Sequence, residues 1–162
     1  MFKQTFNKEL TKYIISEQDR LYRLAYSYTQ NEQDALDVVQ TAIVKALSAP
    51  DMREPRYLKT WVYRIVVNTA IDSLRARKRL VLSDDWVFED EAGDSSEETS
   101  LDMQDALNKL PADLKTIVVL RYFHEFQLQE VADVLSMNLN TVKTRLYRAL
   151  RLLKIEMEED HE

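Results

Sequence analysis

Residues 58–79 read LKTWVYRIVVNTAIDSLRARKR, a pattern that predicts one long amphipathic helix. Its apolar stripe recurs at every fourth position and consists of Leu58, Val62, Val66, Ala70 and Leu74. A polar ridge is offset by two residues, which puts it on the opposite face, and consists of Thr60, Arg64, Asn68, Asp72, Arg75 and Arg79. A cationic cluster, which packing against a core would not require, lies at the end of the helix and consists of Arg75, Arg77, Lys78 and Arg79. We therefore expect one face to be buried and the other to contact an anionic partner such as DNA.

The composition of the 162-residue chain favours a helical protein. Hydrophobic residues make up 45% and charged residues 31%, as in globular proteins. One Gly and three Pro leave little material for the tight turns that a sheet needs. We therefore predict an all-α fold with two small helical domains. The predicted parts are an N-terminal three- to four-helix bundle (residues 1–82), a flexible acidic linker (83–100) and a C-terminal four-helix domain with a helix-turn-helix and an acidic tail (101–162).

Charge is distributed unevenly along the chain. The net charge of −6 would by itself argue against a nucleic-acid ligand. Residues 1–82, however, carry 14 Lys and Arg against 9 Asp and Glu, and residues 101–154 carry 8 against 6. The acidic residues gather in residues 83–100, which hold 8 Asp and Glu and no Lys or Arg, and in the tail after residue 154. Two basic modules joined by an acidic connector are compatible with DNA binding.

Local signals divide the N-terminal module into helices. Asn31 is a good N-cap, and Asp34 follows three residues later in the manner of a capping box. Pro50 ends the helix that follows, and Pro55 keeps the next residues extended or turned. The periodicity of this helix predicts that its inward-facing residues are Leu36, Val39, Ile43 and Leu47. In the linker, the apolar residues Trp86, Val87 and Phe88 fit either a small docking point or a staple against one module.

A helix-turn-helix is predicted near the C-terminus, in LQEVADVLSMNLNTVKTRLYRALRLLK (residues 128–154). The turn lies at Ser136 to Asn138, and Asn138 is a plausible N-cap for the second helix. The buried stripe of that helix consists of Val142, Leu146, Ala149, Leu150 and Leu153. Its exposed side chains are of the kinds that read bases and contact phosphates, and we expect DNA contact from Asn140, Thr141, Lys143, Thr144, Arg145, Tyr147 and Arg148.

The first module has the composition of a site for single-stranded nucleic acid, in which aromatic residues alternate with Lys and Arg. Trp61 lies near the apolar stripe and is best read as a core residue, whereas Tyr57 and Asn68 are the better candidates for touching a base. The residues alone do not decide between binding of single-stranded nucleic acid and a purely structural role for these aromatic and basic residues.

Enzymatic and membrane classes find little support. The chain has no Cys and only two His, His124 and His161, without metal-ligand spacing, so we expect no metal site, no cofactor and no enzyme. A glycine-rich phosphate loop is also absent. No run approaches the ~18 apolar residues of a membrane span, and the N-terminus lacks a signal-peptide core. A cytoplasmic location is therefore expected.

Four motifs in order give the chain a family resemblance: DALDVVQTAIVKA, TWVYRIVVNTAIDSLR, LPADLKTIVVLRYF and NTVKTRLYRAL. The chain resembles an extracytoplasmic-function sigma factor of the sigma-70 family, from about Ser16 to Lys154. The resemblance implies a −10 promoter module that also binds core polymerase (region 2) at the N-terminus, a −35 module (region 4) at the C-terminus and a linker between them. In similar proteins the acidic linker threads polymerase channels that otherwise hold nucleic acid.

The resemblance also implies roles for individual residues. The surface for the clamp helices of core polymerase would comprise Asp34, Asp37, Val39, Gln40 and Thr41. The −10 site would comprise a base-flipping loop and the long helix, with Met52, Arg53, Arg56, Tyr57, Arg64, Asn68, Arg75, Arg77, Lys78 and Arg79. At the −35 element, Lys143, Thr144 and Tyr147 match positions that read the major groove. Arg145 and Arg148 match phosphate contacts. Thr41 stands where the family usually has Glu, and Ile43 where it has Phe.

The implied partners are core RNA polymerase, through its clamp helices and flap, promoter DNA, and an anti-sigma factor that is often membrane-anchored. The implied function is promoter selection and capture of melted −10 DNA, in an envelope or stress response, without bond chemistry or a small-molecule substrate. Two alternatives remain on the residues alone. One is a stand-alone helix-turn-helix transcription regulator, and the other is an adaptor that binds proteins and never touches DNA.

Overall fold

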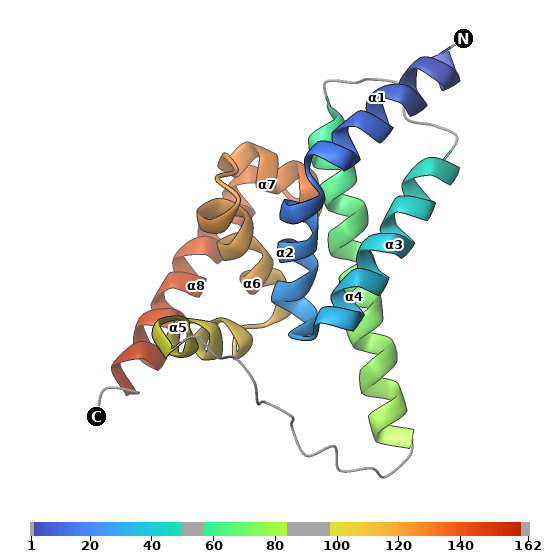
Figure 1. The fold of residues 1–162 in the computed structure, drawn as a ribbon. Helices are drawn as coiled ribbons and strands as arrows, with labels where there is room; N and C mark the ends of the chain where they lie inside the picture. Colours follow the sequence, from blue (N-terminus) through green and yellow to red (C-terminus); the bar gives the residue numbers. More distant parts are fainter. Residues whose placement is uncertain (1, 50–56, 84–97, 160–162) are drawn as a thin grey trace.

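The chain is helical throughout the part that the structure describes. This computed structural model describes residues 2–49, 57–83 and 98–159, and no strand occurs within these ranges. The helices, shown in Figure 1, are α1 (Phe2–Ser16), α2 (Gln18–Thr29), α3 (Glu32–Ser48), α4 (Leu58–Ser83), α5 (Glu98–Asn108), α6 (Ala112–Val118), the π-helical turn η2 (Val119–Phe123), α7 (Leu128–Leu135) and α8 (Leu139–Glu159). The prediction of an all-α chain with two helical domains is confirmed. Within the described ranges, no helix is long and apolar enough to cross a bilayer.

Helices α1–α4 form an N-terminal bundle in which α2, α3 and α4 all contact one another. The predicted stripe of α4 lies in its core, with Leu58, Val62, Val66 and Ala70 buried. The Asn31 side chain caps α3 as predicted, because its Oδ1 accepts the Asp34 N–H at 2.9 Å. The burial places one face of α4 in the core of the bundle, and the cap defines where α3 begins.

Helices α5–α8 and η2 form a C-terminal bundle that contains the predicted helix-turn-helix, α7 and α8. Ser136 ends α7 in the left-handed conformation (φ 54°, ψ 45°), which glycine adopts most easily. Asn138 Oδ1 accepts the Asn140 N–H at 2.7 Å and so caps α8 as predicted. At the other end of α7, the Glu130 carboxylate accepts the Gln127 N–H at 2.9 Å in a capping box. The turn is therefore built without glycine.

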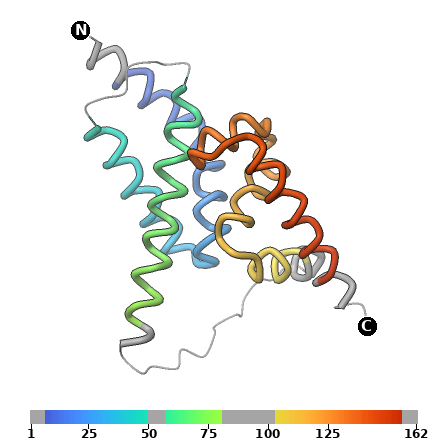
Figure 2. The backbone as a smooth tube through the Cα atoms, turned by 180° about the vertical axis from the view of Figure 1, so that it is seen from behind, coloured from blue at the N-terminus to red at the C-terminus, as the bar shows by residue number. Residues whose placement is uncertain are grey.

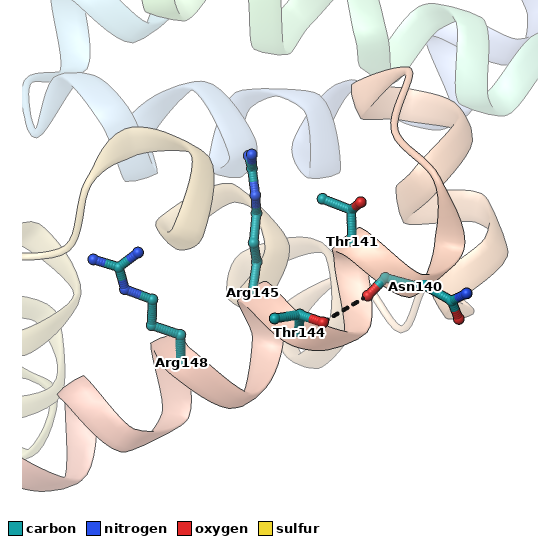
Figure 3. Close-up of a pocket in the computed structure, with 5 residues that line it drawn as sticks. All are labelled: Asn140, Thr141, Thr144, Arg145 and Arg148. Carbon is teal, nitrogen blue, oxygen red and sulfur yellow. Dashed lines mark hydrogen bonds between the residues drawn. The ribbon is translucent and has the colours of Figure 1, made fainter.

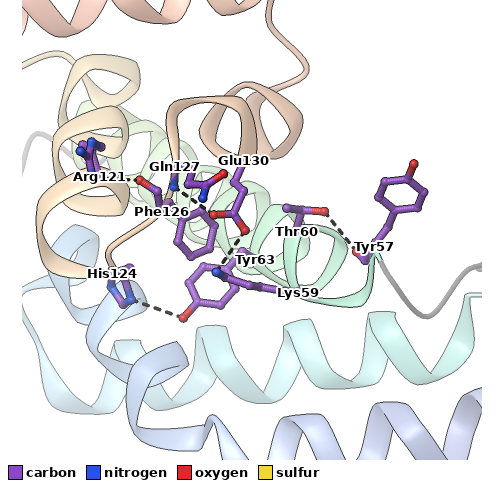
Figure 4. Close-up of polar contacts among 9 residues, drawn as sticks. All are labelled: Tyr57, Lys59, Thr60, Tyr63, Arg121, His124, Phe126, Gln127 and Glu130. Atoms are coloured by element: carbon purple, nitrogen blue, oxygen red, sulfur yellow. Dashed lines mark hydrogen bonds and ion pairs between the residues drawn. The ribbon is translucent and has the colours of Figure 1, made fainter.

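The two bundles pack directly against each other. Figure 2 shows α4 lying between α3 and the C-terminal bundle. The Tyr63 ring of α4 packs on Phe126, with ring centroids 4.7 Å apart, and meets His124 edge-on at 5.5 Å. The Tyr63 hydroxyl lies 3.3 Å from His124 Nδ1 (Figure 4). Tyr63 belongs to neither face of the pattern in residues 58–79, and it is only 1% exposed because the second bundle covers it.

Burial at this contact shifts the pKa values of the groups in it. Burial lowers the pKa of His124 to about 4, assisted by the positive charges of Arg20, Arg23 and Lys59. Burial also raises the pKa of Tyr63 to about 12. Both groups are therefore neutral at pH 7. His124, which in the sequence is only a histidine without metal-ligand spacing, is part of the contact between the bundles.

The His124→Gln substitution tests the cost of charging this site. The folded protein holds His124 neutral, whereas the unfolded chain protonates it below its ordinary pKa of 6.5. The unfolded state therefore binds more protons between pH 6.5 and 4, so the free energy of unfolding should fall by up to ~3 kcal/mol as the pH drops through this window. His124→Gln should remove that component in urea unfolding at pH 7 and pH 4.5, while the control His161→Gln should keep it. An unchanged pH dependence in His124→Gln would contradict the assignment.

Candidate nucleic-acid interface

The first surface with DNA-binding chemistry is the exposed side of α8. Asn140, Lys143, Thr144 and Arg148 are exposed, and Tyr147 is 69% exposed, because the opposite side of the helix is held in the core by Val142, Leu146 and Ala149. Thr144 Oγ1 donates to the Asn140 carbonyl at 3.0 Å. This bond orients the hydroxyl toward the preceding turn of the helix.

A shallow hollow lies along this side of α8. Figure 3 shows the residues that line it: Asn140, Thr141, Thr144, Arg145 and Arg148. Arg145 is partly buried because its guanidinium bonds the Asp113 carboxylate of α6 at 2.8 Å. It also lies 3.7 Å from the Met137 sulfur. The structure thus gathers the predicted residues of this surface, with Arg145 held by the bundle and Arg148 free to extend.

The second surface is the polar ridge of α4. Asn68 is exposed, as are all four residues of the cationic cluster, Arg75, Arg77, Lys78 and Arg79. Tyr57 is 48% exposed, and Figure 4 shows its ring pointing away from the contact between the bundles. Trp61 is partly buried and packs against the core, as expected. The predicted residues Met52, Arg53 and Arg56 lie outside the described residues, as do Trp86, Val87 and Phe88.

One member of this ridge is already engaged within the protein. Arg64 Nε donates to the Val134 carbonyl of α7 at 3.2 Å, and its Nη2 donates to the Asp133 carbonyl. These carbonyls lie in the last turn of α7, which carries partial negative charge, and the Asp133 carbonyl also accepts the Ser136 N–H at 3.4 Å. Arg64 was predicted to contact DNA, but in this arrangement its guanidinium is hydrogen-bonded to the C-terminal bundle.

The third surface is the outer side of α3, where Asp37, Gln40 and Thr41 are exposed as predicted. Val39, which the periodicity predicted to face inward and the resemblance placed on the polymerase surface, is 9% exposed and packs in the core beside Ala35 and Val38. Asp34 is paired with Arg77 of α4 through a 2.9 Å ion pair. The structure thereby joins a residue predicted to bind polymerase to one predicted to bind DNA.

Apolar side chains on the outer side of α3 were missed as surface residues. Leu36 and Leu47, expected to face inward, are 38% and 45% exposed, and Val44 is 63% exposed. The signal was present in the sequence, since α3 carries more apolar residues than one stripe can bury. An apolar row beside exposed polar groups has the character of a protein-docking surface.

Side chains that could ligate a metal are dispersed in the described part of the chain. No three His, Asp or Glu side chains there lie close enough together to hold a metal ion. Every buried side-chain nitrogen or oxygen described has a hydrogen-bond partner, so no polar atom is left aimed at an absent ligand. The three surfaces are open faces suited to macromolecules.

Comparison with known proteins assigns the family. The family model of sigma-70 region 2 matches residues 14–80, and that of sigma-70 region 4 matches residues 100–153. The chain is 43% identical over 160 residues to the RNA polymerase sigma factor SigV of Bacillus subtilis, covering 98% of this chain and 96% of the relative. It is 29% identical to the extracytoplasmic-function sigma factor SigW of the same organism, covering 87% and 84%.

Solved structures agree in fold over both bundles. The sigma factor RpoE of Bartonella quintana, in complex with the anti-sigma factor NepR, matches with a TM-score of 0.77 and 25% identity over 93% of this chain and 98% of that one. CnrH, in complex with the cytosolic domain of CnrY, matches with a TM-score of 0.70 and 25% identity over 93% and 88%. The chain belongs to the sigma-70 family of bacterial RNA polymerase sigma factors, in its extracytoplasmic-function group.

Proposed function

We propose that this chain is an alternative sigma factor that binds core RNA polymerase, directs it to specific promoters and helps to open them. The observation that carries the proposal is that one chain presents two separate DNA-type surfaces, on α8 and on α4, beside the polar and apolar surface of α3. A stand-alone regulator needs only the first of these, and the family assignment gives that alternative no support. The proposed activity is binding without bond chemistry.

Residues 101–162 would recognise the −35 element through α8. The exposed Lys143, Thr144 and Tyr147 would contact base edges in the major groove, since each carries a donor, a hydroxyl or an apolar group toward solvent. Arg148 would contact a phosphate. Arg145 would contact only a phosphate that its guanidinium can reach while it remains bonded to Asp113.

Residues 1–82 would capture the −10 element through α4. Asn68 has both amide donor and acceptor groups exposed on a rigid helix, which suits the edge of an unpaired base. Tyr57 offers a ring face on which a base can stack. The cluster of Arg75, Arg77, Lys78 and Arg79 would hold the backbone of the duplex upstream. Melting then costs less, because unstacked bases gain contacts with the protein.

The outer side of α3 would bind the clamp helices of core polymerase. The polar part of this surface consists of Asp34, Asp37, Gln40 and Thr41. The exposed apolar row of Leu36, Val44 and Leu47 supplies apolar surface that is removed from water on binding. The C-terminal bundle would contact the flap. Residues 83–100 would serve as the acidic linker between the two bundles.

An anti-sigma factor is the proposed regulator, since the matched structure of RpoE is that of a sigma factor in complex with the anti-sigma factor NepR. We place the chain in the cytoplasm, where promoter DNA and polymerase are, and assign it to an envelope or stress response. No cofactor enters the proposed mechanism.

Run-off transcription tests the function directly. Core polymerase is supplied with a set of promoters from the host, with and without this chain. At least one start site should depend on the chain, because core polymerase alone lacks promoter recognition. Absence of any chain-dependent start, from a chain that binds core polymerase normally, would refute the proposal.

Asn68→Ala tests the role of α4 in opening. Loss of the amide should slow open-complex formation by about tenfold or more, the equivalent of 1–3 kcal/mol in one base contact, while closed-complex binding changes little. Permanganate footprinting of unpaired thymines and gel-shift titration separate the two steps. Asp72→Ala is the matched control, since Asp72 is exposed one helical turn further along the same ridge. An equal loss in both steps would argue against a −10 role.

Lys143→Ala tests the role of α8. If the ammonium reads a base, its loss should cost ~1–3 kcal/mol of discrimination at one position of the −35 element. The assay measures promoter binding by holoenzyme on a panel of single −35 substitutions. Lys154→Ala, an exposed lysine of the same helix well away from its N-terminal half, is the control. Unchanged discrimination across the panel would remove Lys143 from the reading set.

A further inference from the structure

An ion pair ties the DNA-facing helix α8 to α6. Arg145 of α8 donates from Nη1 to the Asp113 carboxylate of α6 at 2.8 Å, and the same nitrogen lies 3.7 Å from the Met137 sulfur. The two side chains of the pair are 39% and 43% exposed. The pair therefore lies at the surface, where Arg145 lines the hollow of α8 together with Asn140 and Arg148 (Figure 3).

Stability gives little reason for this pair. Ion pairs with this much exposure add little to folding, because water and salt screen them and two side chains must be ordered. Packing already holds α6 against α8, since Leu114 and Ile117 of α6 and Leu146 and Ala149 of α8 are buried. The main effect of the pair is therefore expected on the ligand that α8 binds.

Arg148 shows what an arginine of this hollow does without such a pair. It lines the same hollow, is exposed, and has no ion pair or hydrogen bond within the described part of the chain. An unpaired arginine can follow a phosphate to many positions with its long side chain, whereas Arg145 can do so only by breaking its bond to Asp113. The hollow thus holds one free guanidinium and one anchored guanidinium.

The anchored guanidinium can still bind an anion. A guanidinium has several N–H donors, and Asp113 and Met137 engage only Nη1 of Arg145. Arg145 can therefore bond a phosphate through its other nitrogens while it keeps Asp113. The backbone that carries the carboxylate is held in place, because the neighbouring Leu114 and Lys115 are buried. A contact that is oriented before DNA arrives loses less conformational entropy on binding.

The same carboxylate disfavours DNA bound in other positions. A phosphate that approaches Asp113 away from the anchored guanidinium meets a like charge. Phosphate contacts fix the register of a protein on the duplex, so a restricted phosphate position restricts the register of α8 in the groove. The base-reading candidates of α8 are then presented to one set of base edges. A repulsive element of this kind adds to specificity by weakening the wrong complexes.

We propose that Asp113 is a specificity-determining residue for the −35 element, which acts by anchoring Arg145 so that α8 docks on the phosphate backbone in one register. The inference rests on the proposed sigma function and deepens it, because it assigns specificity to a residue outside the helix that enters the groove. Asp113 is a positioning residue, since it acts through Arg145 and needs no contact with a base.

Asp113→Asn tests the anchor in holoenzyme, because the amide has nearly the shape of the carboxylate but lacks its charge. A released Arg145 should bind phosphates in any register. Holoenzyme should then bind a promoter with a scrambled −35 element about fivefold more tightly. The slope of log K against log [KCl] on that promoter should steepen by about one. Discrimination between intact and singly substituted −35 elements should fall about fivefold or more.

Matched variants show whether Asp113 acts through Arg145. Asp105→Asn removes the same charge from an exposed residue of α5 and should change neither discrimination nor slope. Asp113→Glu keeps a carboxylate and should retain most of the discrimination. In a chain that already carries Arg145→Gln, adding Asp113→Asn should have no further effect on either quantity. Urea unfolding of each variant checks that the bundle remains folded.

The outcomes separate this inference from the function on which it rests. Tighter binding to the scrambled promoter, together with lost discrimination, supports the anchor. Unchanged discrimination and slope in folded Asp113→Asn would overturn it, as would an equal loss of affinity on every template or a full effect of Asp113→Asn in the Arg145→Gln chain. Absence of any transcription start that depends on the unmodified chain would instead overturn the sigma function itself.

Discussion

The fold depends on α4 being buried on two sides at once. Its predicted stripe fills the core of the N-terminal bundle, while Tyr63 reaches the other way and fills the contact with the C-terminal bundle. One rigid helix therefore belongs to two hydrophobic assemblies and carries the Asn68 ridge between them. The buried residues of both bundles belong to one hydrophobic cluster, which includes Leu58, Val62 and Val66 as well as Tyr63 and Phe126.

Much of this was predictable from local chemistry. The helices around Asn31 and Asn138 follow from capping side chains, whose hydrogen bonds act within a few residues. The exposed side of α8 follows from the period of its buried stripe. The partner of each surface was predicted from the family motifs and their order. Periodicity alone shows that a face is exposed but not whether it binds DNA or protein.

The failures of the periodicity have a common physical cause, which is that a helical repeat predicts which side chains share a face but not which of them another element covers. Leu36 and Leu47 were predicted to face inward together with Val39, yet only Val39 is buried and the two leucines are substantially exposed. On α4, Tyr63 and Arg64 met partners more than 60 residues away in the chain. No pattern within one helix contains information about a second bundle that folds against it.

The ion pair between Asp34 and Arg77 makes two proposed surfaces energetically dependent on each other. A carboxylate 2.9 Å from a guanidinium cannot fully serve a new partner without weakening its hold on the old one. Polymerase that engages Asp34 would leave Arg77 freer for a phosphate, and a phosphate that engages Arg77 would leave Asp34 freer for polymerase. Thermodynamic reciprocity requires the two effects to be equal in free energy. Attachment to the enzyme and attachment to the template would then strengthen each other through a single pair of side chains.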